Sequence, residues 1–176
     1  MKSRITVLAA VICLTSFLYA QEVSLPDTYR AISLGMDLET VQEQLKKDGI
    51  FGYRGERDVS LLHSANRSLI ETMGPSFISR SWFQFHQENL YVMIFKLDTT
   101  RIDYYSMYTA LVKKYGEPSI LDPRKALWTD ERITLTLERP LTVKYVDMTV
   151  FSELTEADTS ERAVSDILRE EFIRGF

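Results

Sequence analysis

The side chains that most often carry out enzyme chemistry are sparse in this chain. It has two histidines, His63 and His86, and neither belongs to a cluster spaced like metal ligands. Ser81 and His86 could pair as nucleophile and base on paper. Five residues apart on one strand, however, they would point to opposite faces, so His86 is better interpreted as an ordinary strand residue. The seven glycines are scattered and form no phosphate-binding loop.

The carboxylates are plentiful but form no obvious pair. Glu153, Glu156 and Asp158 lie close together and could bind calcium weakly, but their spacing matches no calcium loop. Acidic residues also gather at the start of a helix, which is the simpler explanation here. A hydrolase remains the least favoured alternative, because paired catalytic carboxylates can be far apart in sequence. We therefore expect no catalytic residue, no metal ligand and no cofactor.

The aromatic side chains are the remaining chemical signal. They make up 11% of the chain, more than one small core readily absorbs. Tyr104 and Tyr105 are adjacent, so both cannot point at the same sheet, and at least one is expected to be partly exposed. Exposed aromatic residues are common at protein interfaces. The candidate partner-binding residues are Tyr104, Tyr105, Tyr108, Trp82 and Phe172.

Two helices with clear boundaries are expected to position these residues. Asp37 can cap a first helix whose apolar face is Leu38, Val41 and Leu45, and Gly49 ends it. Asp103 can cap a second helix, which Gly116 and Pro118 end. The broad apolar side of the second helix carries Tyr104, Tyr105, Tyr108, Leu111, Val112 and Tyr115.

Strands are expected before and after the second helix. The strongest signal is a hairpin of residues 81–86 and 90–97 that turns through Gln87, Glu88 and Asn89. Its second strand is apolar on both faces, which predicts a central place in the sheet. The other strands are expected at residues 29–34, 59–63, 69–73, 126–129, 133–137 and 143–151.

A closing helix is expected at about residues 158–175. Asp158 and Glu161 fit a capping box, and Val164, Ile167, Leu168 and Phe172 share one face. This helix either packs on the sheet or is offered to another protein.

The N-terminus has the pattern of a secretory signal. Lys2 and Arg4 precede an apolar stretch from Ile5 to Leu18, and Ala20 precedes polar residues. We expect residues 1–20 to be removed and residues 21–176 to form a single periplasmic domain; a buried helix or a retained anchor is the alternative. Lipidation at Cys13, the only cysteine, is not favoured, because bulky residues precede it.

The charge balance disfavours two classes of partner. Without Lys2 and Arg4, 19 basic residues face 25 acidic ones, a net charge of −6, and the signs are interspersed. Nucleic acids and anionic lipid headgroups both require concentrated Lys and Arg, so we expect no nucleic-acid binding and at most a peripheral association with the membrane.

The expected fold is α+β, an antiparallel sheet with helices on one face and a C-terminal amphipathic helix. The two helix ends read alike at an offset of 67 residues, since Leu45-Lys46-Lys47-Asp48-Gly49 can be laid over Val112-Lys113-Lys114-Tyr115-Gly116. This predicts a helix-then-meander unit made twice, at about residues 30–98 and 99–152. The alternative is that both helices simply share a common type of ending.

The frame of these units resembles a known group of envelope proteins. Leu34-Gly35-Met36 with Val41 opens the first helix, and Tyr115-Gly116-Glu117-Pro118 ends the second. Both are similar to the glycine-helix-glycine-x-proline frame of outer-membrane assembly lipoproteins of the SmpA/BamE type and of the beta-lactamase-inhibitor-protein fold. Phe51 stands where that frame has a proline, and Cys13 lacks a lipidation context. The resemblance implies protein binding in the periplasm and assigns no residue a role.

The sequence thus predicts an exported, non-catalytic protein that binds an envelope or periplasmic protein. Binding of a small apolar or lipid ligand between helix and sheet is the alternative.

Overall fold

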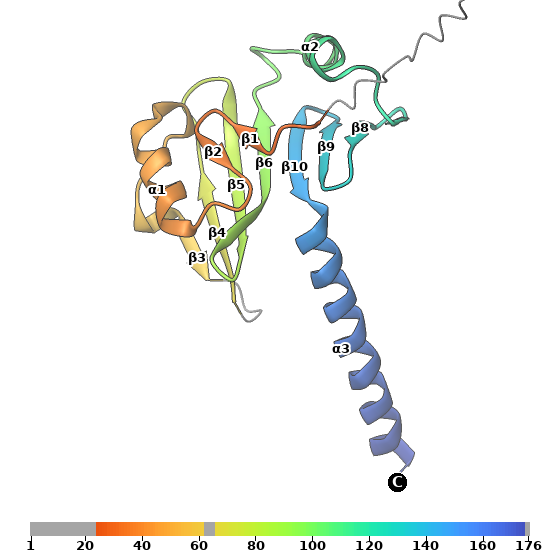
Figure 1. Cartoon of the computed structure of the whole chain (residues 1–176). Helices are drawn as coiled ribbons and strands as arrows, with labels where there is room; N and C mark the ends of the chain where they lie inside the picture. Colours follow the sequence, from red (N-terminus) through yellow and green to blue (C-terminus); the bar gives the residue numbers. More distant parts are fainter. Residues whose placement is uncertain (1–23, 62–65, 175–176) are drawn as a thin grey trace, which may run out of the picture.

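Two capped helices, each followed by antiparallel strands, form the framework of the molecule (Figure 1). The computed structural model describes residues 24–61 and 66–174, with the side chains of residues 160–168 and 170–172 outside the description. The expected signal peptide, Cys13 and His63 lie outside the described residues. No helix in the described part is long and apolar enough to cross a membrane.

Helix α1 (Leu38–Lys47) begins and ends where the sequence predicts. The Asp37 carboxylate accepts a hydrogen bond from the Thr40 backbone N–H at 2.8 Å, which satisfies one of the unpaired donors of the first turn. Val41 and Leu45 are fully buried against the sheet. The 3-10 turns Gly49–Phe51 and Glu56–Asp58 then lead into β3 (Val59–Leu61), the first strand of the main sheet.

The strands of the main sheet form two meanders that meet in the middle. The first meander is β3 (Val59–Leu61), β4 (Arg67–Thr72), β5 (Ile78–His86) and β6 (Asn89–Leu97). After α2 (Tyr104–Tyr115), the second is β7 (Ile120–Leu121), β8 (Lys125–Thr129), β9 (Ile133–Glu138) and β10 (Thr142–Asp147). The order is β3-β4-β5-β6-β10-β9-β8-β7, so β6 pairs with β10 and is central, as predicted.

The α+β class and the helix-then-meander arrangement made twice are therefore present in the structure. We call α1 to β6 the first unit and α2 to β10 the second unit (Figure 1). The predicted hairpin is also confirmed, with one change. Gln87 and Glu88 alone form its turn, both with positive φ, and Asn89 already belongs to β6.

Alternate residues of the strands build one core beneath the two helices. Phe83 on β5, Phe95 on β6 and Tyr145 on β10 are buried on the face that α1 and α2 cover. Phe95 lies at the seam of the two units, with ring centroids at 5.9 Å from Phe83 and 6.2 Å from Tyr145. Tyr29 and Phe51 complete this aromatic cluster.

The predicted strand at residues 29–34 is wrong in form. The segment folds into two short strands, β1 (Thr28–Tyr29) and β2 (Ile32–Ser33), which pair antiparallel. Arg30, in the turn between them, has a φ of 57°. The small hairpin places Tyr29 and Ile32 over the core.

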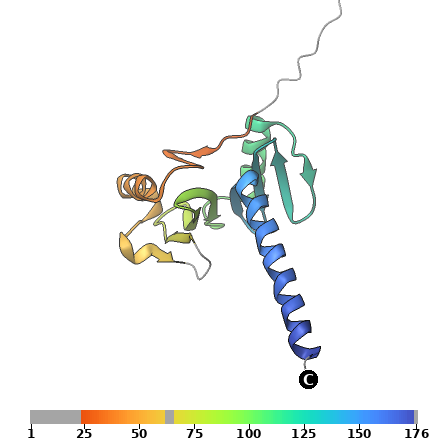
Figure 2. The ribbon, with the colours of Figure 1, turned by 60° about the horizontal axis from the view of Figure 1, so that its bottom comes forward.

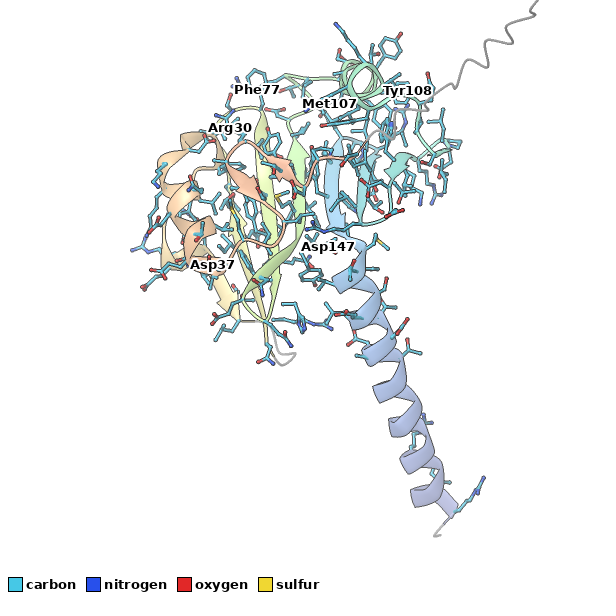
Figure 3. The ribbon with its side chains drawn as sticks, viewed as in Figure 1. Arg30, Asp37, Phe77, Met107, Tyr108 and Asp147 are labelled. Atoms are coloured by element: carbon cyan, nitrogen blue, oxygen red, sulfur yellow. The ribbon has the colours of Figure 1, made fainter. Side chains whose placement is uncertain are left out.

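The boundary between the last strand and the closing helix is also wrong. β10 ends at Asp147, and α3 runs from Met148 to Arg174, so residues 148–151 are helical and Asp158 lies inside the helix. The Asp147 carboxylate accepts the Thr149 N–H at 3.1 Å and the Arg132 Nε–H at 2.9 Å. It therefore caps α3 and ties it to the start of β9 (Figure 3). Two views show α3 projecting away from the sheet, so it does not pack along the sheet (Figures 1 and 2).

Candidate partner-binding groove

The second helix is held at both ends by local hydrogen bonds. Asp103 accepts the Ser106 backbone N–H at 2.9 Å and its hydroxyl at 2.6 Å. These bonds, the hydroxyl bond first, lower the pKa of the Asp103 carboxyl. At the other end the Gly116 N–H donates to the Val112 carbonyl at 2.8 Å, and Gly116 has a φ of 77° that glycine adopts readily. The helix is thus a defined platform with the predicted boundaries.

One side of α2 is anchored to the second unit. Leu111 is buried in the core, and the Tyr108 ring lies 6.3 Å from the Trp128 ring. Trp128 in turn donates its indole N–H to the Gly116 carbonyl at 2.8 Å. The Tyr104 hydroxyl donates to the Leu137 carbonyl at 3.4 Å. These contacts fix the direction in which the helix presents its remaining side chains.

Tyr105 points away from that anchored side. It is 74% exposed, whereas Tyr104 and Tyr108 are half-buried. The expectation that at least one of the two adjacent tyrosines is partly exposed is confirmed. A tyrosine held on a helix presents a large apolar ring at a low cost in conformational entropy, which suits a contact residue.

A groove open to solvent lies between α2 and the β7–β8 hairpin at the edge of the sheet. Its volume is about 270 Å³. We call it the α2–β7 groove, and Figure 3 shows Tyr108 on the helix that forms one of its walls. The groove is lined by Tyr104, Tyr105, Tyr108, Leu121, Asp122 and Arg139.

The opposite wall is β7, an edge strand of the main sheet. Ile120 and Leu121 are 53% and 61% exposed, although both are large aliphatic residues. The turn after them is fixed by Asp122, whose carboxylate accepts the N–H groups of Arg124 at 2.7 Å and Lys125 at 3.0 Å. These bonds, the one from Arg124 first, lower the pKa of Asp122, so it is ionised at neutral pH.

Arg139 is the cation that lines the groove. Its guanidinium lies 4.0 Å from the centre of the Tyr104 ring, a cation–π contact. Its Nε–H donates to the Pro123 carbonyl at 3.1 Å. Within the part of the chain that the structure describes, no carboxylate lies at ion-pair distance from Arg139, so its charge is available to a ligand. Burial raises the pKa of Tyr104, while Arg139 acts in the opposite direction.

The groove therefore combines apolar rings, an exposed leucine and one cation. Its single carboxylate is ionised and engaged by backbone amides, which suits a structural role in the turn. Among the described residues, no group of three or more His, Cys, Asp or Glu side chains could hold a metal ion. The arrangement is chemically suited to binding an apolar group beside an anionic one.

The structure brings together three of the five sequence-predicted residues. Tyr104, Tyr105 and Tyr108 line the groove. Trp82 lies on β5 between the buried Ser81 and Phe83, so it points to the other face of the sheet, where Arg80 lies 5.8 Å from its ring. The side chain of Phe172 lies outside the described residues.

The other residues considered for chemistry are dispersed. Ser81 is fully buried on the core face of β5. Glu153, Glu156 and Asp158 lie within α3, and Asp158 forms an ion pair with Arg67 at 3.0 Å. These three residues therefore do not mark the start of a helix, and that interpretation is wrong.

Sequence reasoning missed the remaining residues of the groove. Leu121 belongs to a two-residue strand, which is too short to give a periodic signal. The only sequence signal for an edge strand here is the pair of prolines, Pro118 and Pro123, on either side of it. Arg139 reaches the groove from the end of β9. No local pattern could have paired it with Tyr104, which is 35 positions earlier in the chain.

The fold and the groove define a class of protein: a two-unit α+β domain with an open, mainly apolar groove at one sheet edge. The chain belongs to the TP0088 domain family, whose model matches residues 27–157. That match spans both units and the first turns of α3. No curated protein and no solved structure matches the chain.

Proposed function

We propose that this chain is an exported, non-catalytic protein that binds a partner protein of the cell envelope through the α2–β7 groove. The observation that carries the proposal is the exposure of Tyr105 and Leu121 on opposite walls of one groove. Export is inferred from Lys2, Arg4 and the apolar run that follows them. The resemblance of the helix frames to envelope assembly modules supports the same setting.

The exposed apolar surface supports a protein partner. Tyr105 and Leu121 are each more than half exposed and line the same groove. Aromatic residues in a partly enclosed pocket are the usual anchors of a protein interface, and a surrounding polar rim excludes water. Asp122 and Arg139, which line the same groove, are the charged residues available for such a rim.

A small apolar ligand is the second candidate, because the groove has a definite volume. Its 270 Å³ falls just below the usual range for ligand pockets, about 300–1,000 Å³, and it is open to solvent. An enclosed cavity would suit a lipid better than this groove does. The two candidates predict different results in one experiment.

The test is site-specific photo-crosslinking in the native cell. A photoreactive residue replaces Tyr105, and a matched control places it at Leu61, which is 85% exposed at the opposite sheet edge. We expect one envelope protein to crosslink at Tyr105 and not at Leu61. Its yield should fall at least tenfold when Leu121→Ala is added.

Two results would contradict the proposal. The same set of proteins at both positions would mean that the groove is not a specific interface. Recovery of lipid alone at Tyr105, with no protein band, would favour the small-ligand candidate.

A further inference from the structure

We propose that the occupant of the α2–β7 groove is an extended peptide segment of the partner, added to the sheet as a new antiparallel strand beside β7. The segment carries a large apolar residue that enters the groove and, two residues away, a carboxylate that reaches Arg139. This inference rests on the proposed function and specifies the chemistry of the partner.

The outer side of β7 offers backbone groups to such a strand. The Asp122 N–H donates to the Lys125 carbonyl at 2.9 Å, so these residues form a hydrogen-bonded pair across the hairpin. Antiparallel pairs alternate, and Leu121 opposite Ala126 is therefore a non-hydrogen-bonded pair. The N–H and C=O of Leu121 consequently point away from β8, toward the open edge.

The same register decides which way the guest side chain points. Leu121 pairs with Ala126, whose buried side chain faces the core and α2, so the Leu121 side chain lies on the α2 side of the sheet. Directly paired residues on neighbouring antiparallel strands project to the same face. A guest residue bonded to Leu121 would therefore place its side chain between Leu121 and Tyr105, inside the groove.

Charge complementarity specifies the second feature of the guest. Residues two apart on a strand share a face, so the guest's next side chain on the α2 side also lies along the groove. Arg139 lines the same groove as Tyr105 and forms no ion pair with any described carboxylate. A guest carboxylate there would form a charge-assisted hydrogen bond with the guanidinium.

The length of the guest is limited by the edge itself. Pro118 and Pro123 flank β7, and proline has no N–H to donate to a neighbouring strand. Pairing is thus confined to about residues 119–122. A short segment fits this edge, whereas a long strand or a second sheet does not.

The test uses synthetic peptides and the purified protein of residues 21–176. The probes are two fluorescein-labelled hexapeptides of Thr and Val with a central Phe, one with Asp two residues before it and one with Asp two residues after it. Matched controls carry Asn for Asp, or an N-methyl group on the Phe amide. Fluorescence anisotropy gives the Kd of each peptide.

We expect one of the two peptides to bind, and N-methylation to weaken it at least tenfold. The methyl group removes the donor to the Leu121 carbonyl but leaves every side chain in place. Asp→Asn should weaken binding about fivefold to wild-type protein and leave binding to Arg139→Gln unchanged. Leu121→Pro should weaken it at least tenfold more than Leu121→Ala, while Ile120→Ala on the other face has no effect.

The outcomes separate this inference from the proposed function. Equal binding of the N-methylated peptide, or no binding by either probe, would overturn the added-strand inference. If crosslinking at Tyr105 still captured one envelope protein, the proposed function would stand without it. If crosslinking also failed, both proposals would be wrong.

Discussion

Replacing Phe95 by alanine should destabilise both units together, because its ring lies at their seam. Phe95 is 2% exposed and sits opposite Val143 in the pairing of β6 with β10. Its ring contacts Tyr29, Phe83 and Tyr145, with centroids 4.6, 5.9 and 6.2 Å away. A Phe→Ala change in a core costs about 3–5 kcal/mol through lost burial and the cavity left behind.

That cost can be read as a shift in urea midpoint. With a slope of about 2 kcal/mol per molar urea, a loss of about 3–5 kcal/mol lowers the midpoint by roughly 1.5–2.5 M. The total stability of a small domain is about 5–15 kcal/mol, so the milder Phe95→Leu provides a second variant that is expected to stay folded. Leu61→Ala, at an 85% exposed position, is the matched control and should leave the midpoint unchanged.

The chain contains one tryptophan in each unit, which makes the assay unit-specific. Trp82→Phe leaves Trp128 on β8 as the reporter, and Trp128→Phe leaves Trp82 on β5. Each is combined with Phe95→Leu, and fluorescence is followed in urea. We expect both reporters to show one coincident transition, shifted equally. A shift at Trp82 with an unchanged transition at Trp128 would refute a shared core.

Three further predictions address single local features. Gly52→Ala should strongly destabilise the fold, because Gly52 has a φ of 62° and an added Cβ would lie 2.2 Å from the Met73 carbonyl oxygen. Gly49→Ala is the control, since a Cβ there meets nothing within 4 Å. Thermal melts of the two variants test this. Asp103→Asn should flatten the acid side of the stability profile. The pKa of Asp103 is lowered in the folded protein, so the contribution of this carboxylate to stability is complete above the unfolded pKa and is lost as pH falls through the folded pKa. The melting temperatures at pH 7 and pH 3 should therefore differ less in the variant than in wild type. Asp147→Ala should speed hydrogen exchange in the first turn of α3, and unchanged exchange there would mean that Asp147 is no cap.

The elements that the sequence predicts well are those with local boundary signals. Asp37 and Asp103 cap their helices because an aspartate before an apolar periodic run satisfies an unpaired amide within three residues. The β5–β6 hairpin follows from two apolar runs around a polar turn. In each case the residues whose interaction fixes the element are close in sequence to the pattern that predicts it.

The start of α3 fails for the opposite reason. Residues 143–151 are rich in β-branched and aromatic side chains, which favours a strand throughout, and Asp158 with Glu161 imitates a capping box. The true cap, Asp147, is held by Arg132, which lies 15 positions earlier. That contact exists only once β9 and β10 have paired. The long-range contact between Asp147 and Arg132 therefore decides whether residues 148–151 continue the strand or begin the helix.

The residues of the groove also divide into those that the sequence predicts and those that it cannot predict. The tyrosines of α2 can be found from the sequence, because their number and adjacency exceed what one helix face can bury. Leu121 and Arg139 cannot, because they reach Tyr104 only through the order of the strands in the second meander. Trp82 is predicted from its residue type, and strand alternation places it on the other face.

The comparison of the two units explains why the groove belongs to the second. At the offset of 67 residues, Leu38 and Val41 of α1 correspond to Tyr105 and Tyr108 of α2. Val41 is fully buried, whereas Tyr108 is half-buried and Tyr105 is 74% exposed. The first helix thus carries side chains that the core can absorb, while the second carries rings too large to be buried at the same places. Tyr105 is thus left exposed beside the open edge of β7, on the surface where we propose that a partner binds.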